Sequence, residues 1–258
     1  MKIQYCSDLH LEFDANTDYI KRNPIKPVGD IIILAGDITY LNFYYQRQTE
    51  KDFIDYLSNN FSFVYLMLGN HEFYGGDDIG ILDKPVYEKL KNNVALVNNI
   101  VVVHDSVKII FSVLWSKISE KNRNIVSNGM NDFQLIPYHG KRFTVKDFNK
   151  LHEHSVQFIQ KELQKNYENQ KIVIATHHVP TKACNSPDFE GSPLNDAFIA
   201  DLDDLIMKND IDYWIYGHIH RNLPEIKVGN TKLVCNQLGY IHANENKGYK
   251  SDACIKIK

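Results

Sequence analysis

Five short runs of apolar residues stop abruptly at polar residues, a pattern that predicts buried strands. The predicted strands are 2–5, 30–34, 63–68, 172–175 and 213–216. Helical spacing of apolar residues between several of them predicts helices at about 49–59, 84–91, 144–166 and 196–208. Asp83 is expected to cap the second helix, with Pro85 in its first turn. Strands that alternate with helices favour a layered α/β fold.

A second kind of segment interrupts this alternation. Residues 94–97, 100–103 and 107–114 are strand-like, but the turns between them are too short for crossover helices. Gly229 and Asn230 separate strand-like residues 226–228 and 232–235, which predicts a hairpin. The sheets are therefore expected to be mixed, with tight antiparallel pairs beside helix-linked strands.

Two long segments, 116–143 and 180–195, are predicted as loops. Long loops inside a compact domain are often functional, so we expect substrate specificity to reside there. Because neither an internal repeat nor a linker-like stretch divides the chain, a single domain over residues 1–258 is expected.

Composition and charge exclude several classes of protein. The 258 residues are 43% hydrophobic and 24% charged, as in globular proteins, and the formal net charge is −3. This balance argues against binding to nucleic acid or membrane through bulk charge. No apolar run approaches the about 20 residues of a spanning helix, and no signal peptide is visible, so a cytoplasmic protein is expected. The four cysteines lack metal-site spacing and are expected to be small buried residues.

Polar residues follow the five predicted strands in a way that packing does not require. The strand ends read Ser7-Asp8-Leu9-His10, Gly36-Asp37, Gly69-Asn70-His71-Glu72, Thr176-His177-His178 and Gly217-His218-Ile219-His220. Ligands of open α/β sheets bind at this edge. In extended backbone, residues two apart point to the same side, which would pair Asp8 with His10 and His218 with His220. Adjacent residues face opposite ways, so at most one of His177 and His178 is expected to serve the same site.

These strand ends offer seven nitrogen or oxygen ligands: Asp8, His10, Asp37, Asn70, one of the two adjacent histidines, His218 and His220. One cation takes about four to six ligands, whereas two cations sharing a bridging carboxylate use all seven. Gly36, Gly69 and Gly217 precede ligands, where a missing Cβ lets the backbone approach a metal or an oxyanion.

The ordered motifs Asp-x-His, Gly-Asp, Gly-Asn-His-Glu, His and Gly-His-x-His resemble those of the calcineurin-like metallophosphoesterase superfamily, from Met1 to about Tyr240. Residues 130–133, 194–198 and 234–240 are similar to a subgroup of small bacterial and phage members. The resemblance implies a four-layer α/β/β/α sandwich with two mixed sheets, in agreement with the mixed strand pattern.

The resemblance also implies a role for each site residue. Asp37 would bridge two divalent cations, and His71 would protonate the leaving group. One cation would be held by Asp8, His10 and His220, the other by Asn70, His177 and His218. Glu72 is expected to orient a neighbouring histidine. Arg221 is a candidate contact for a substrate phosphate, with a solvated loop arginine as the alternative.

The implied activity is hydrolysis of a phosphate mono- or diester by a hydroxide that bridges two metal ions, without a phosphoenzyme. Mn²⁺ is expected to support activity in vitro, with Fe, Zn and Co as alternatives. A small-molecule phosphodiester is preferred over a phosphoprotein or nucleic acid as substrate. Aromatic residues 43–45 and 73–74 are interpreted as packing residues rather than a nucleobase platform. The alternative from another class is a non-catalytic metal-binding scaffold of the same fold.

Overall fold

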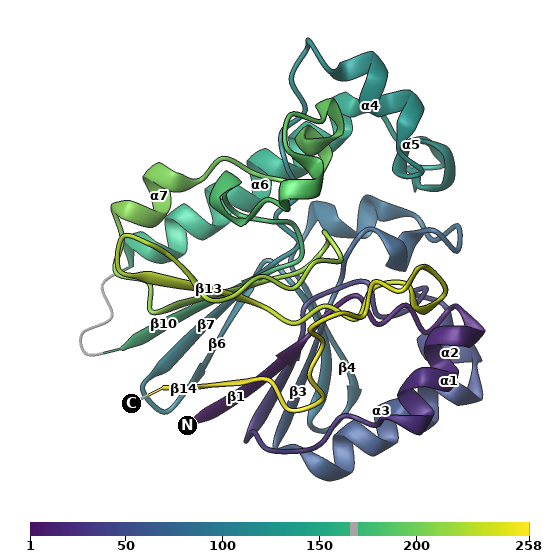
Figure 1. Cartoon of the computed structure of the whole chain (residues 1–258), viewed down its shortest axis with the longest axis vertical. Coiled ribbons are helices and arrows are strands. Elements are labelled where there is room, and N and C mark those ends of the chain that lie inside the picture. Colours follow the sequence, from purple (N-terminus) through teal and green to yellow (C-terminus); the bar gives the residue numbers. More distant parts are fainter. Residues whose placement is uncertain (166–169, 258) are drawn as a thin grey trace.

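The chain forms two sheets that pack face to face, with helices on both outer faces (Figure 1). The computed structural model describes residues 1–165 and 170–257. Within this part, the first sheet has six strands in the order β14-β1-β2-β3-β5-β4. Their bounds are β1 Lys2–Cys6, β2 Ile31–Leu34, β3 Phe63–Met67, β4 Val86–Lys91, β5 Val94–Asn98 and β14 Cys254–Lys256.

The second sheet likewise has six strands among the described residues, in the order β12-β13-β11-β10-β7-β6. Their bounds are β6 Ile100–His104, β7 Val107–Ser112, β10 Lys171–Thr176, β11 Tyr213–Tyr216, β12 Ile226–Val228 and β13 Thr231–Cys235. Inner strands of both sheets pair in parallel, while the edge strands β4, β6, β12 and β14 pair antiparallel. This confirms the predicted mixed sheets.

Helices complete the predicted four-layer sandwich. On the first sheet lie α1 Asp14–Arg22, α2 Phe43–Gln46 and α3 Gln48–Asn60, and on the second lie α6 Val145–Gln164 and α7 Asp203–Met207. The segment between β7 and α6 extends from one end of the sandwich and holds α4 Arg123–Gly129, α5 Asp132–Leu135 and the short hairpin of β8 Pro137–Tyr138 and β9 Lys141–Arg142. None of the described helices is long and apolar enough to cross a bilayer.

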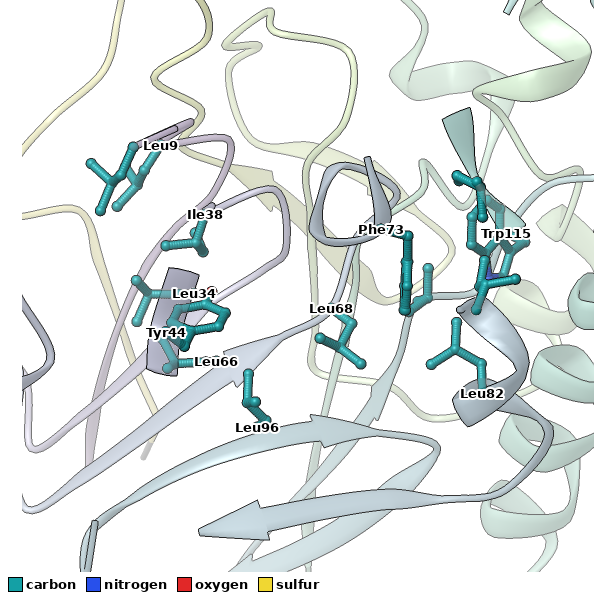
Figure 2. Packing of buried hydrophobic residues seen from close by; sticks show 14 of the residues in the cluster. Leu9, Leu34, Ile38, Tyr44, Leu66, Leu68, Phe73, Leu82, Leu96 and Trp115 are labelled. Atoms are coloured by element: carbon teal, nitrogen blue, oxygen red, sulfur yellow. The ribbon is translucent and has the colours of Figure 1, made fainter. Parts of the chain in front are cut away.

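The continuous apolar runs arise because inner strands are buried on both faces. On β2, Ile31 and Ile33 enter the core between the sheets, whereas Ile32 and Leu34 pack under the helices. Figure 2 shows the helix-side cluster around Leu34, Leu66, Leu96, Tyr44 and Phe73. The packing interpretation is therefore confirmed for Tyr44 and Phe73, which are 3% and 0% exposed.

Most predicted elements are confirmed. The five strands form, as do the hairpin of β12 and β13 and the helices α3 and α6. Helix α6 begins with a capping box, in which Thr144 and Asp147 each accept the other's backbone N–H. Helices α1 and α2 were not predicted, and the two long segments contain short helical elements instead of irregular loop throughout.

The predicted helix at 84–91 is wrong, because residues 86–91 form the edge strand β4. Val86 and Leu90 are half-buried and the residues between them are exposed. A spacing of four residues places two side chains on one face of a helix and also on one face of a strand. Antiparallel pairing with β5 decides in favour of the strand.

The predicted helix at 196–208 is confirmed only for α7, its last turn. The 3₁₀ helix η5, Pro193–Ala197, precedes it, and Ile199 then pairs with Val179 in an isolated parallel bridge. This bridge binds the segment to the end of β10 in an extended form, which stops a helix from spanning the whole range.

Strands β5 and β6 do not form the tight antiparallel pair that their short connection predicts, because they belong to different sheets. Asn98 and Asn99 form the corner between them. The Asn98 side-chain oxygen accepts the Val113 N–H at 2.9 Å, and that of Asn99 accepts the Ser112 hydroxyl at 2.7 Å. At the corner, these two side chains accept hydrogen bonds from the Val113 N–H and the Ser112 hydroxyl, which lie at and beyond the end of β7.

Candidate active site

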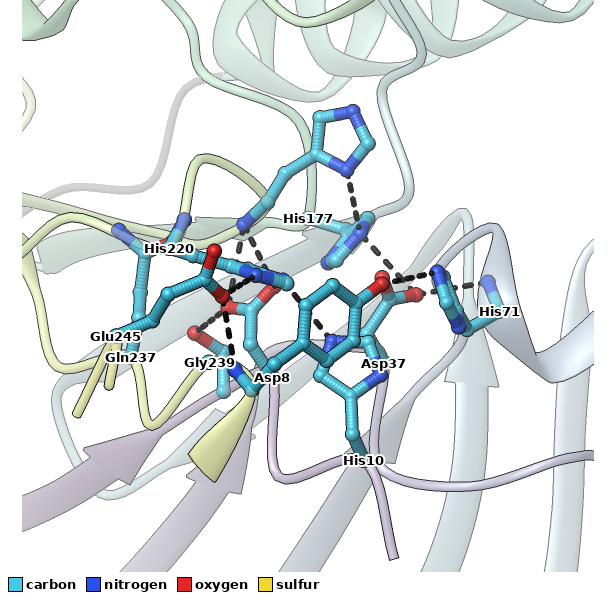
Figure 3. Close-up of polar contacts among 12 residues, drawn as sticks. Asp8, His10, Asp37, His71, His177, His220, Gln237, Gly239 and Glu245 are labelled. Atoms are coloured by element: carbon cyan, nitrogen blue, oxygen red, sulfur yellow. Dashed lines mark hydrogen bonds and ion pairs between the residues drawn. The ribbon is translucent and has the colours of Figure 1, made fainter. Parts of the chain in front are cut away.

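The carboxyl ends of the parallel strands from both sheets meet at one edge and bring the predicted site residues together. Three groups of candidate ligands form there among the described residues, each with its ligand atoms within 4.8 Å of one another. Two of them share Asp37, and the third, His10, Glu12 and His71, lies beside them. Of the two that share Asp37, the first group is Asp8, His10, Asp37 and His220, and the second is Asp37, His177 and His218. Figure 3 shows Asp37 beside His177. One buried carboxylate therefore belongs to both groups.

In the first group, two imidazole nitrogens face each other. His10 Nε2 lies 2.9 Å from His220 Nε2. The opposite nitrogens donate to carboxylates, His10 Nδ1 to Glu12 at 2.9 Å and His220 Nδ1 to Glu245 at 2.6 Å. Each donated proton leaves a lone pair on the facing Nε2 atom. Two lone pairs at this distance suit a shared cation or proton.

In the second group, His177 faces three polar atoms. Its Nδ1 donates to the Ala35 carbonyl at 2.9 Å, so Nε2 is the ring nitrogen that faces the site. This Nε2 lies 3.1 Å from Asn70 Oδ1, 3.2 Å from Asp37 Oδ1 and 3.1 Å from His218 Nδ1. Asn70 presents its oxygen because its amide nitrogen donates to Asp132 at 3.0 Å and to the Tyr74 hydroxyl at 3.1 Å.

The pKa values of the buried histidines follow from the charges around them. Although burial opposes the charge, the Asp37 carboxylate raises the pKa of His177 to about 9. Burial likewise opposes charge on His220, but hydrogen bonds to Asp8 and Glu245 raise its pKa to about 10. Burial and the nearby His177 lower the pKa of His218 to about 3. Buried acceptors that converge in this way fit two divalent cations, whose binding would displace the protons.

The backbone at these residues corrects one prediction. Asp8 and His10 have φ of 55° and 48°, and His218 and His220 have 79° and 49°, so neither pair lies in extended backbone. Asp37, at 55°, is also left-handed. Each such residue costs about 1–2 kcal/mol relative to ordinary backbone. Left-handed turns, rather than continued strands, direct these side chains into the centre, and strain of this kind is typical of functional sites.

Three glycines permit the close approach that their positions predicted. A Cβ on Gly36 would lie 2.5 Å from His177 Nδ1, and one on Gly217 would lie 2.7 Å from Asp8 Oδ2. A Cβ on Gly69 would overlap the carboxylate of Asp37. Side chains at these positions would therefore displace the candidate ligands.

Gly36→Ala is expected to lose cation binding and to lower the melting temperature more than Gly76→Ala. The two glycines have φ of 87° and 90°, so both substitutions carry the same left-handed strain, about 1–2 kcal/mol. Only at Gly36 does the new methyl group meet the His177 ring, because nothing lies within 4 Å of a Cβ on Gly76. Thermal unfolding and elemental analysis measure the difference. Equal losses in both variants would contradict this explanation.

His71 lies beside the two groups and lines a cavity of about 330 Å³. Its Nδ1 is 3.0 Å from Glu12 Oε1, and its Nε2 is 3.1 Å from the hydroxyl of Tyr240, another lining residue. Burial disfavours the charged ring, but the carboxylates of Asp37 and Glu12 raise its pKa. These carboxylates therefore favour the charged form of His71 at the edge of the site.

The structure adds residues that the sequence analysis missed. Glu12 receives both His10 and His71 on one oxygen, and Glu245 receives His220. Asp132 orients Asn70. Glu12 lies two residues beyond His10, so the Asp-x-His motif extended by one step would have found it. Asp132 belongs to residues 130–133, a motif that the sequence analysis singled out without assigning it to the site. No local pattern links Glu245 to the site, because it is distant along the chain.

The predicted role of Glu72 in orienting a histidine is wrong. Its carboxylate instead accepts three backbone N–H groups, from Asp37 at 3.1 Å, Ile38 at 2.8 Å and Gly69 at 2.6 Å. It therefore ties together the turns that follow β2 and β3. Glu72 is fully buried beneath these turns, and its carboxylate bonds to their backbone amides instead of to a histidine ring.

Two further sequence candidates have definite positions. His178 is absent from both groups and packs its ring 4.9 Å from Trp115 and 4.1 Å from His218. Arg221 donates to Asp188 at 3.1 Å and is not among the described residues that line the cavity. Its contact with a substrate phosphate stays a prediction.

Comparison with known proteins defines the class to which this fold and site belong. The profile of the calcineurin-like phosphoesterase family matches residues 1–222, and the chain belongs to this family. It is 30% identical over 272 residues to an uncharacterised protein of Acanthamoeba polyphaga mimivirus, covering 95% of this chain and 93% of that protein.

Two solved structures share the fold. The phosphopantetheinyl hydrolase PptH of Mycobacterium tuberculosis is 14% identical, with a TM-score of 0.68 over 98% of this chain and 95% of that one. A dimetal phosphatase of Danio rerio is 12% identical, with a TM-score of 0.50 over 92% and 87% of the two chains.

Proposed function

We propose that this protein hydrolyses phosphate mono- or diesters with the help of two divalent cations. The observation that carries the proposal is the pair of buried acceptor groups sharing Asp37. Asp8, His10 and His220 would hold one cation, Asn70, His177 and His218 the other, with Asp37 between them. The donor set suits Mn²⁺, Fe, Zn or Co, and Mn²⁺ is the cation we would supply first.

The residues of the chain divide the work of hydrolysis. Two bound cations would acidify a shared water molecule and neutralise charge on the phosphoryl oxygens. His71 would donate its Nε2 proton to the leaving oxygen, because Glu12 holds the opposite nitrogen and favours the charged ring. Glu12 and Glu245 fix the tautomers of His10 and His220, so that Nε2 of each ring faces its cation.

Among substrates, we favour a small-molecule phosphodiester. The net charge of −3 gives little attraction for nucleic acid. The fold shared with a phosphopantetheinyl hydrolase makes a phosphopantetheine ester a sensible member of a substrate panel. We also propose that residues 1–258 form one domain, since strands of both sheets contribute to one core between them.

Metal-saturated protein is expected to bind two cations per chain, since Asp37 belongs to both acceptor groups and each group holds further ligands. Elemental analysis after dialysis from excess Mn²⁺ gives the stoichiometry, and a chromogenic phosphate ester gives the turnover. One cation or fewer at saturation would contradict the dimetal assignment. Two cations without turnover of any ester in the panel would favour the non-catalytic scaffold instead.

A further inference from the structure

The cavity beside the proposed cation sites has a wall built by the two long segments. Met130 and Asn131 come from the first segment, and Phe189, Leu194 and Asn195 come from the second. The wall thus combines apolar side chains with side-chain amides. Both segments border the candidate site, and the expectation that substrate specificity resides in them stays a prediction.

Asp196, the residue directly after the second segment, connects it to the first by hydrogen bonds. The Asp196 carboxylate accepts the Ser119 N–H at 3.0 Å, the Ser119 hydroxyl at 2.6 Å and the Asn122 amide at 3.0 Å. The Asp196 carbonyl also accepts the Ser116 hydroxyl at 2.7 Å. Within the second segment, Asn195 donates to the Phe189 carbonyl at 2.7 Å. The wall is therefore organised before a substrate arrives.

The described residues of the wall built by the two segments carry no positive side chain. Among the described residues that line the cavity there is no lysine or arginine, and its histidines, His71, His218 and His220, lie at the end of the candidate cation sites together with the carboxylates of Asp37 and Glu245. Arg221, next to His220 in sequence, is paired with Asp188. The proposed cations would neutralise the phosphoryl group. A second anion on the leaving group would meet amides and apolar atoms but no positive side chain of the wall.

We propose that the leaving group selected by this cavity is a neutral, partly apolar alcohol able to form hydrogen bonds, with no second phosphate or carboxylate. The proposal rests on the phosphoesterase function proposed above. In the reaction, water supplies the new bond to phosphorus, the bond between phosphorus and the alcohol oxygen breaks, and the alcohol leaves with a proton. Nucleoside polyphosphates and nucleic-acid strands fall outside this class, because further phosphates adjoin the reacting one.

A matched pair of esters tests the proposal. The metal-loaded protein is assayed with 4-carbamoylphenyl phosphate and 4-carboxyphenyl phosphate, which have the same shape and differ in one negative charge. We expect kcat/KM for the carbamoyl ester to exceed that for the carboxy ester about tenfold, as for an unpaired charge at a polar contact. The 4-carbamoyl- and 4-carboxybenzylphosphonates, which are not hydrolysed, should differ likewise in Kd by calorimetry. Equal values, or a preference for the anion, would overturn the proposal. Turnover of no phosphate ester would overturn the proposed function, and this inference with it.

A positive charge introduced into the wall tests whether the wall itself sets the preference for the uncharged ester. Asn131 is exposed, and its side chain makes no cap hydrogen bond at the start of α5, so Asn131→Lys leaves the fold intact. This variant should lower the carbamoyl preference severalfold by pairing the carboxylate. Asn124→Lys is the control, because Asn124 is also exposed in the first segment but does not line the cavity. An equal change in both variants would mean that net charge, and not this wall, sets the preference.

Discussion

Asp37→Asn should abolish turnover and release cations from both halves of the centre. Among the described residues, Asp37 alone belongs to both acceptor groups, so neutralising it would weaken both cation sites at once. Replacing a residue that merely orients a ligand already costs about 10–100-fold in metal affinity or activity, and we expect a loss beyond about 100-fold here.

The choice of asparagine separates this effect from misfolding. Asp37 has a φ of 55°, and asparagine tolerates the left-handed region better than most residues. The amide oxygen still accepts the His71 backbone N–H that Asp37 accepts at 2.9 Å. The metal-free variant should therefore still fold and unfold cooperatively on heating, while elemental analysis and turnover should show the loss of cations and activity.

Asn70→Asp is the matched control for Asp37→Asn. It keeps an oxygen ligand on the second group and adds a negative charge, so cations should remain bound. The variant loses the hydrogen bond that Asn70 donates to Asp132, and we expect this loss to lower turnover about tenfold. Near-wild-type turnover of Asp37→Asn, or a larger loss in Asn70→Asp, would refute the shared role of Asp37.

His71→Asn should leave both cations bound and lower kcat most for esters with poor leaving groups. His71 lines the cavity, and neither of the two groups that share Asp37 includes it. A group that donates a proton in the transition state contributes about 10²–10⁴-fold. An alkyl phosphate ester needs this proton because its alkoxide leaves poorly, whereas nitrophenolate leaves readily without it.

The measurement is a ratio, the rate loss on an alkyl ester divided by the loss on a nitrophenyl ester, with metal content determined for each variant. His177→Asn is the control and should lose metal and fail on both esters alike, because His177 Nε2 faces Asn70, Asp37 and His218. A ratio near one with full metal would mean that His71 only positions the phosphate. Loss of metal in His71→Asn would make it a ligand or a structural residue.

The candidate ligands could be predicted from the sequence because neighbouring parallel strands run in the same direction. Each buried strand ends where its apolar run ends, and the carboxyl ends of parallel neighbours lie at one edge. Asp37 and Asn70 could therefore be placed near each other from the runs of β2 and β3 alone. The role of the glycines before the ligands could also be predicted, because a Cβ at these positions would overlap the candidate ligands.

The predictions of secondary structure and pairing were wrong where a local sequence pattern is compatible with two different structures. Residues 86–91 have apolar spacing that suits a helix or a strand, and pairing with β5 decides. The short connection at Asn98 and Asn99 suits a hairpin or a corner, and the packing of two sheets decides. In both cases the deciding partner is another part of the chain, which a local pattern does not contain.

By itself, the sequence determined which residue types stand at the strand ends, and hence the chemistry available to the site. The tertiary structure alone decided how that chemistry is arranged: the left-handed turns at Asp8 and His220, the carboxylates of Glu12 and Glu245 that set the imidazole tautomers, and the wall held by Asp196. The physical reason is range. The periodic pattern of buried residues depends on residues that are close in the sequence. The contacts named above join residues far apart in the chain, and they form only when the two sheets and the loops above them pack together.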